Sequence, residues 1–274
     1  MAKLALIYAY WPSQPFGITW CDLPWAIRNA GLPKTLSDAG HEITETMLMP
    51  EDDPPEDLRA GFRIGRDIAA AVQKARAFGE LPVVLTGSCS IAAPAVIAGI
   101  GGAGTAIAWF DTHPDLHTAE TTETGLFEGM ALAIATGSAW QAMAQQFLNL
   151  KPASLDAAAL FGARDIDTAE RDIITERGLL VTQDAADLAQ RMSAAERVYL
   201  HVDMDVHDPS AFAANLYEVP GGPSVDDVRA ALTSVDNVAA LSITSLDPAV
   251  DESGDAVRAA IGHVLAVADH LGND

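Results

Sequence analysis

Residues 106–117 read AIAWFDTHPDLH, and residues 198–209 read VYLHVDMDVHDP. Each stretch begins with a short, mainly apolar run, which predicts a buried strand at Ala106–Phe110 and another at Val198–Val202. Directly after these strands, metal-ligating residue types recur at a spacing of two: Asp111, His113 and Asp115 in the first stretch, and Asp203 and Asp205 in the second. We therefore expect two buried strands whose carboxyl ends present acidic side chains.

Similar short aliphatic runs alternate with helical patterns through most of the chain. The other expected strands are Leu4–Tyr10, Glu42–Met47, Val83–Leu85, Ala158–Phe161 and Leu241–Thr244. The expected helices are Trp25–Ala39, Leu58–Phe78, Ile91–Ile100, Ala169–Arg177, Asp255–Leu271 and one that Ser224 and Asp227 open as a capping box. Apolar strands that alternate with helices indicate a parallel sheet with helices on both faces. We predict an α/β fold, with residues 1–274 in a single domain.

The composition excludes several classes of partner. The chain has 38 acidic and 16 basic residues, for a net charge of −22, so it would repel nucleic acid and anionic membranes. Cys21 and Cys89 are its two cysteines, too few for a disulfide framework. No apolar run approaches the roughly 20 residues that a membrane span needs. We therefore expect a cytoplasmic protein whose partners include neither nucleic acid nor a membrane.

The acidic residues after the two strands suggest a metal site. At a spacing of two in extended backbone, Asp111, His113 and Asp115 share one side, and Asp203 and Asp205 do the same. Carboxylates crowded at the ends of buried strands repel one another unless a cation neutralises them. Such oxygen and imidazole ligands suit Mn²⁺, Fe²⁺, Co²⁺ or Zn²⁺. Asp-rich strand ends are also common as helix caps and turns, but the presence of two such clusters favours a metal site.

Both motifs resemble signatures of the ureohydrolases, the family of arginase, agmatinase and formimidoylglutamase. Residues 109–118, continuing through 124–130, resemble the second signature, and residues 201–210 resemble the third. Weaker similarities lie at residues 86–90, 162–167 and 245–248. The resemblance implies the fold shared by arginases and deacetylases, and a homo-oligomer.

The resemblance also implies a binuclear manganese centre, with two ions per subunit and a bridging hydroxide that attacks the guanidinium carbon. By correspondence with the family, Asp111 and Asp203 would bridge both ions, His113 and Asp205 would complete one site, and Asp115 would serve the other and assist proton transfer. The substrate residues implied are Asp167 for an α-amino group, and His117 and Thr118 for an α-carboxylate, although His117 replaces the usual asparagine.

Three positions depart from the family pattern. Cys89 stands where the first signature has a histidine ligand; a thiolate would favour Zn²⁺ over Mn²⁺, and otherwise Cys89 is a buried apolar residue beside a weakened or empty site. Glu128 replaces a proton-shuttling histidine, and would act as acid or base or bind a cationic substrate. Ser245 replaces the glutamate that pairs with the guanidinium. With cysteine in its first signature, the chain is similar to N-hydroxyarginine amidinohydrolases.

We therefore predict a metal-dependent hydrolase that cleaves a C–N bond of a small cationic guanidino or amidino compound. Two alternatives remain: a formimidoyl or amide deacylase with one zinc ion, and a catalytically inactive metal-binding relative. Among the other histidines, we expect His201 to support the site or pack in the core, and His207 and His263 to lie in loops or at the surface. Trp11 and Trp20 would pack in the core, contact another subunit or cover the substrate.

Overall fold

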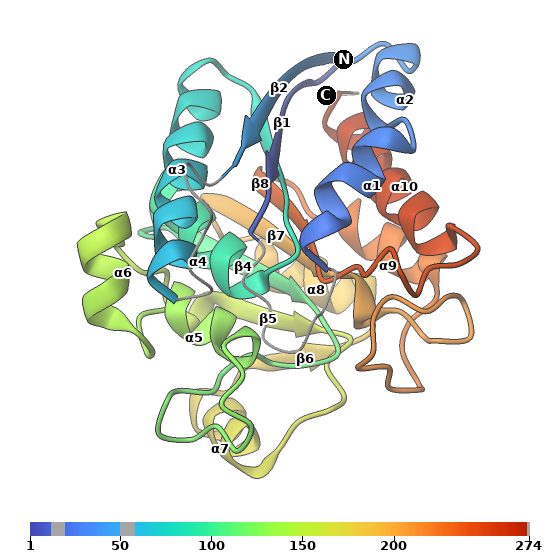
Figure 1. Cartoon of the computed structure of the whole chain (residues 1–274). Helices are drawn as coiled ribbons and strands as arrows, with labels where there is room; N and C mark the ends of the chain where they lie inside the picture. The colour runs from blue at the N-terminus through green and yellow to red at the C-terminus, as the bar shows by residue number, and fades with distance from the viewer. Residues whose placement is uncertain (12–19, 50–57, 273–274) are drawn as a thin grey trace.

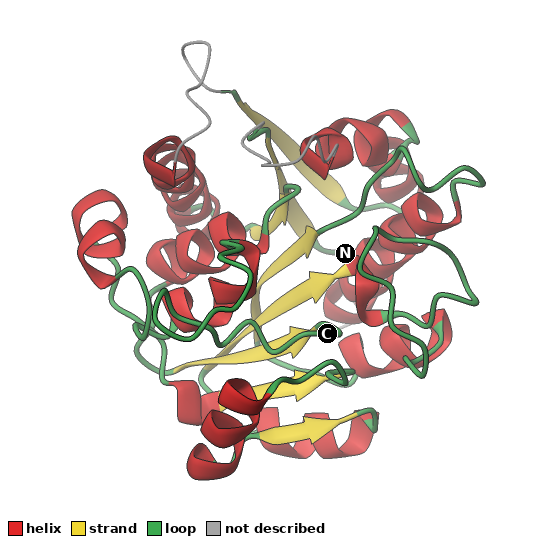
Figure 2. Cartoon of the chain, turned by 60° about the horizontal axis from the view of Figure 1, so that its bottom comes forward, coloured by secondary structure: helices red, strands yellow, loops and turns green. Residues whose placement is uncertain are grey.

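The computed structural model describes residues 1–11, 20–49 and 58–272, and its strands form one sheet in which all neighbours run parallel. The strand order is β2-β1-β3-β8-β7-β4-β5-β6. The strands are β1 (Lys3–Ala9), β2 (Glu42–Leu48), β3 (Leu81–Leu85), β4 (Thr105–Phe110), β5 (Ala158–Phe161), β6 (Leu180–Thr182), β7 (Arg197–Asp203) and β8 (Val238–Thr244). Figure 2 shows the strands side by side between helices. The predicted parallel α/β fold is confirmed.

Helices cover both faces of this sheet (Figure 1). One layer holds α1 (Leu23–Asn29), α2 (Leu32–Asp38), α8 (Ala185–Met192), α9 (Val225–Leu232) and α10 (Asp255–Gly272). The other holds α3 (Leu58–Ala77), α4 (Cys89–Ile100), α5 (Ala131–Ala135), α6 (Gln141–Leu148) and α7 (Thr168–Arg177). A separate apolar cluster fills the space beneath each layer. Central strands such as β3 and β8 are therefore buried along their whole length, which explains their lack of alternation.

The predicted strands are all present, with ends shifted by at most three residues, and the Ser224–Asp227 capping box is confirmed. The single helix expected at Trp25–Ala39 is wrong, because α1 and α2 are separate. Gly31 adopts a left-handed φ of 102° between them, and Pro33 follows in the first turn of α2. β6, α5, α6 and α8 were not predicted; β6 has only three residues and lies half-exposed at the sheet edge.

His207 and His263 were expected in loops or at the surface. His207 does lie in a loop, although it is buried, whereas His263 is buried within α10, so the prediction is wrong for His263. His207 and His263 are 3% and 0% exposed, and their Nε2 atoms lie 3.0 Å apart. His207 follows the 3₁₀ turn Met204–Val206, and its Nδ1 lies 3.0 Å from the carbonyl oxygen of Met204, which turns the ring inward toward α10. Within the described part of the chain, no helix is both long and apolar enough to cross a membrane.

Candidate metal centre and substrate cavity

Four neighbouring strands, β3, β8, β7 and β4, end at one place and bring most of the predicted site residues together. Cys89 begins the helix after β3, and Ser245 follows β8. Asp203 ends β7, and Asp205 lies in the 3₁₀ turn after it. Asp111 follows β4. Because parallel strands end at the same edge, residues far apart in sequence converge there.

We define the strand-end cluster as Cys89, Asp111, His113, Asp203 and Asp205. Within it, the His113 Nδ1 atom lies 3.3 Å from Asp111 Oδ1 and 3.4 Å from Asp205 Oδ2. Burial and the neighbouring Asp205 raise the pKa of Asp111 to about 7. Burial opposes protonation of His113, but hydrogen bonds to Asp111 and Asp205 raise its pKa to about 12. The His113 ring thus lies between two carboxylates, where a positive charge is favourable.

Cys89 lies deep in the same cluster and is 1% exposed. Its Sγ lies 3.1 Å from Asp203 Oδ2, and also 3.1 Å from the hydroxyl oxygens of Thr244 and Ser245. Although Cys89 opens α4, where the helix dipole favours a thiolate, burial and then the Asp203 carboxylate raise its thiol pKa well above the usual value. The thiol stays protonated unless a cation approaches it.

The backbone bends sharply at two site residues. Asp115 and Ser245 have φ of 52° and 58°, in the left-handed region that non-glycine residues seldom adopt. Such strain is typical of functional sites, where the surrounding fold compensates for it. Glycine is also required at position 87, where the backbone packs directly against the backbone of Trp20. A Cβ atom on Gly87 would lie 2.2 Å from the Trp20 carbonyl oxygen. This explains the glycine of the first signature-like segment.

The donor set fits divalent cations. Asp111, Asp203 and Asp205 are each at most 5% exposed, and burial together with like charges raises the pKa of Asp203 well above its usual value. The Oδ2 atom of Asp111 is buried and has no hydrogen-bond partner among the described residues. A buried carboxylate oxygen without a partner is costly. A cation at this edge would satisfy that oxygen and relieve the repulsion.

A cavity of about 510 Å³ opens over this cluster. Its described lining includes no lysine or arginine. Acidic residues line it together with Trp11, Trp20, Phe127, Trp140 and Tyr217. Trp11 and Trp20 are each 4% exposed, so they pack in the core as well as facing the cavity. The acidic and aromatic surface favours a cationic ligand with an apolar part.

Glu128 belongs to the cavity wall and is anchored by the start of α4. Its carboxylate oxygens accept hydrogen bonds from the Ser88 hydroxyl at 2.7 and 3.0 Å, and Oε2 also accepts one from the Ser90 backbone N–H at 3.2 Å. Hydrogen bonds of this kind favour the charged form of a carboxyl group. Glu128 therefore presents a fixed carboxylate close to Cys89.

A second group, which we call the α7 cluster, joins His117, Asp167 and Glu170. His117 Nε2 lies 2.8 Å from Asp167 Oδ2 and 4.0 Å from Glu170 Oε2. All three residues line the cavity, which places two of the predicted substrate residues together. Thr118 is adjacent in sequence but is not part of the cavity lining; its backbone N–H bonds the Thr121 hydroxyl instead.

The sequence did not single out Glu170 or Asn215. Glu170 is 4% exposed, and its Oε1 accepts the Leu116 N–H at 3.0 Å. The Asn215 amide donates to Asp205 Oδ2 at 3.4 Å and to the Ser245 carbonyl at 3.0 Å, and so ties two site segments together. A glutamate in the first turn of a helix and an asparagine in a loop are common, so neither carried a signal.

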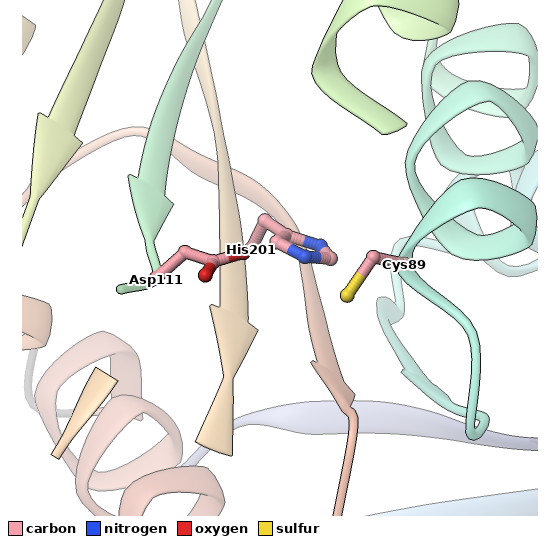
Figure 3. A group of neighbouring side chains, drawn as sticks. All are labelled: Cys89, Asp111 and His201. Atoms are coloured by element: carbon pink, nitrogen blue, oxygen red, sulfur yellow. The ribbon is translucent and has the colours of Figure 1, made fainter. Parts of the chain in front are cut away.

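His201 lies beneath the cluster on β7. It is fully buried, and its ring stacks on Trp109 with centroids 3.7 Å apart and planes 12° apart. Burial lowers its pKa to about 3, so the ring is neutral. One nitrogen of His201, the Cys89 Sγ and a carboxylate oxygen of Asp111 all lie within 4.8 Å of one another (Figure 3).

Comparisons with known proteins agree with this architecture. The model of the arginase family matches residues 24–268. The chain is 28% identical to an arginase of Bacillus subtilis (strain 168) over 76% of this chain and 77% of that protein. It is 29% identical to an N(omega)-hydroxy-L-arginine amidinohydrolase of Streptomyces lavendulae, over 72% and 71%. A crystal structure of arginase from Bacillus subtilis superposes with a TM-score of 0.87 at 24% identity, covering 97% of this chain and 98% of that one.

Proposed function

The chain belongs to the arginase family, and from this premise we propose that it is a metal-dependent hydrolase of a C–N bond in a guanidino compound. Hydrolysis of linear amidines is the activity that its amidinohydrolase and arginase relatives support. The observation that carries the metal requirement is the buried strand-end cluster, in which Asp111 Oδ2 has no partner among the described residues.

We assign the ion-binding role to Cys89, Asp111, His113, Asp115, Asp203 and Asp205. Asp203 Oδ2 lies 3.1 Å from Cys89 Sγ and Asp111 Oδ1 lies 3.3 Å from His113 Nδ1, so these two carboxylates would help to hold ions on both sides of the cluster. When bound, divalent ions lower the pKa of water and supply a hydroxide nucleophile near neutral pH. Asp115 is 6% exposed, and burial followed by the Asp111 charge raises its pKa well above the usual value. That shift suits a group that accepts and returns a proton.

The substrate would lie in the cavity with its amidine carbon near the strand-end cluster. Ser245 offers a hydroxyl 3.1 Å from Cys89 Sγ and no negative charge, so it would not pair with a guanidinium as a carboxylate does. This supports a guanidine that is less basic than that of arginine, such as an N-hydroxylated one, which is the substrate named for the Streptomyces relative. Glu128 would supply a carboxylate to the substrate from the cavity wall near Cys89.

Substrate binding farther from the reacting carbon would fall to the α7 cluster. His117 and Asp167 meet at 2.8 Å, and both line the cavity together with Glu170. Thr118 would contribute only if its loop moved toward the ligand. The identity of the metal as manganese, the homo-oligomer and the cytoplasmic location stay predictions from the sequence.

The test is turnover of a guanidine panel by protein loaded separately with Mn²⁺ and Zn²⁺. We expect N-hydroxyarginine to release hydroxyurea faster than arginine or agmatine releases urea, and a chelator to abolish the reaction. Elemental analysis of the same samples gives the number of ions. Metal-loaded protein that turns over no guanidine would instead support the inactive relative, and one zinc ion with hydrolysis of formimidoyl or amide substrates would support the deacylase.

A further inference from the structure

We propose that His201 is a nitrogen ligand of the ion held on the Cys89 side of the strand-end cluster, so that Cys89, Asp111 and His201 form one metal site. The inference rests on the proposed metal-dependent function and adds a ligand to it. His201 occupies the middle of a buried strand, two residues before Asp203, and so lies on the same side of β7 as that carboxylate.

The geometry places the three side chains around one point. Cys89 comes from the start of α4, Asp111 from the end of β4 and His201 from β7, and all three are buried. One donor atom from each lies within 4.8 Å of the other two. Figure 3 shows the His201 ring between the Asp111 carboxylate and the Cys89 sulfur. Sulfur, imidazole nitrogen and carboxylate oxygen are together a donor set for Zn²⁺ or Co²⁺.

Hydrogen bonds orient the His201 ring for this role. Nδ1 lies 2.8 Å from the Ser242 hydroxyl and 3.0 Å from the Tyr199 hydroxyl, whereas Nε2 has only a 3.5 Å contact with Thr244 Oγ1. Donation by Nδ1–H to Ser242 leaves a lone pair on Nε2. A ligating histidine is typically held in this way through its other ring nitrogen, and the stack on Trp109 fixes the ring plane.

An independent observation points to a missing partner at the same place. Asp111 is 1% exposed, and its Oδ2 has no hydrogen-bond partner in the described structure. The other carboxylate oxygen, Oδ1, is already occupied by the His113 backbone N–H at 2.7 Å. The free oxygen thus belongs to the carboxylate that the thiol and imidazole both approach. Binding of a cation there would release the Cys89 proton to solvent.

The experiment uses Co²⁺ as the probe, added alone to metal-free protein that carries ¹⁵N-labelled histidine. Coordinated imidazoles give hyperfine-shifted, exchangeable N–H signals in the proton NMR spectrum, and a thiolate gives a charge-transfer band in the near ultraviolet. We expect two bound ions, the sulfur band and two shifted imidazole signals, from His113 and His201. This result requires no variant and therefore does not depend on how a variant folds.

Variants then assign the signals. His201→Gln should remove one imidazole signal and weaken one of the two ions by more than the roughly 10–100-fold typical of losing a supporting hydrogen bond; Ser242→Ala should weaken the same ion within that range. His113→Gln should remove the other signal. His263→Gln is the matched control, because it also removes a fully buried histidine but lies outside the cluster, and both signals should persist.

Two results would overturn the inference in different ways. Two bound Co²⁺ ions with a single imidazole signal, retained in His201→Gln, would exclude His201 as a ligand and leave the proposed function intact. Failure of the wild-type protein to bind Co²⁺ would refute the metal-dependent function itself, and the His201 site with it.

Discussion

The strand-end cluster and the α7 cluster both combine acidic residues with a histidine. They differ in how well the surrounding chain stabilises the carboxylate charges. In the α7 cluster, Asp167 caps the helix by accepting the Glu170 N–H at 3.0 Å, and both carboxylates also face His117. In the strand-end cluster, Asp111 and Asp203 are deeply buried and Asp111 Oδ2 has no partner among the described residues. In the α7 cluster, hydrogen bonds and His117 stabilise the carboxylates. In the strand-end cluster, a bound cation is needed to stabilise them.

This difference indicates separate tasks for the two clusters. Carboxylates that are stabilised by the chain can exchange one cationic partner for another at low cost, as substrate binding requires. Buried carboxylates that repel one another destabilise the fold, and a tightly bound cation removes this repulsion. The predictions that follow test whether the two clusters behave as binding and metal groups, respectively.

The largest effect is expected for Asp203→Asn in the strand-end cluster. Loss of this carboxylate should remove bound metal and lower kcat/KM at least about 1000-fold, roughly 4 kcal/mol of transition-state stabilisation.

The same variant, compared without metal, should be more stable than metal-free wild-type protein at pH 7. The folded-state pKa of Asp203 lies well above its unfolded value, so above that unfolded value the residue destabilises the fold, by about 1.4 kcal/mol per pKa unit. We therefore expect a higher free energy of unfolding for the metal-free variant than for metal-free wild type, measured by urea denaturation.

Asp208→Asn is the control for this variant. Asp208 lies three residues beyond Asp205, and it accepts backbone N–H groups of Ser210 and Gly221 at 2.9 and 2.7 Å. An asparagine can accept only one of these two bonds, so the loop should be less stable, but activity and metal content should stay at wild-type values. Equal loss of activity in both variants, or a destabilised metal-free Asp203→Asn protein, would contradict the contrast between the clusters.

The strand-end cluster could be predicted from the sequence because its residues follow a local pattern. Asp111, His113, Asp203 and Asp205 lie two residues apart directly after apolar runs, and the rule for parallel sheets then places the two runs at one edge. The order of the strands was not predicted, because pairing depends on contacts between segments that are distant in sequence. The split of the helix at Gly31 did have a local signal, a glycine followed by Pro33.

The α7 cluster and the residues around His201 were harder to predict from the sequence. Glu170 acts through the Leu116 N–H and His117, and more than 50 residues separate it from each. His201 depends on Tyr199, Ser242 and Trp109, which meet only after β4, β7 and β8 pair. Such residues are recognised by their three-dimensional neighbours, and no spacing rule reveals them.

An intermediate effect is expected for Asp167→Asn in the α7 cluster. The amide keeps the cap on α7 but loses the negative charge that faces His117, so KM for a cationic substrate should rise about 10–100-fold, as for loss of a charged hydrogen bond. Metal content and kcat should change little. Asp172→Asn, an exposed charge change on the same helix, should leave KM unaltered. A fall in metal content for Asp167→Asn would show that the two clusters are not separate.

The smallest effect concerns the pH dependence of KM through Glu170. Burial raises the pKa of Glu170, although the Leu116 N–H and His117 oppose the shift. The carboxylate therefore takes up its proton at a higher pH than an ordinary glutamate. As the pH is lowered, KM for a cationic substrate should begin to rise at a correspondingly higher pH. Glu170→Gln lacks the charge at every pH, so its KM at pH 8 should exceed that of wild type by about twofold to fivefold, or at most about 1 kcal/mol of binding free energy. The effect should be smaller than for Asp167→Asn because Glu170 lies 4.0 Å from His117 and Asp167 lies 2.8 Å from it. Its KM should also change less between pH 8 and pH 5 in steady-state assays.

Glu176→Gln, on the exposed side of α7, is the control and should keep the wild-type pH dependence of KM. If Glu170→Gln also keeps that dependence, Glu170 does not take part in substrate binding.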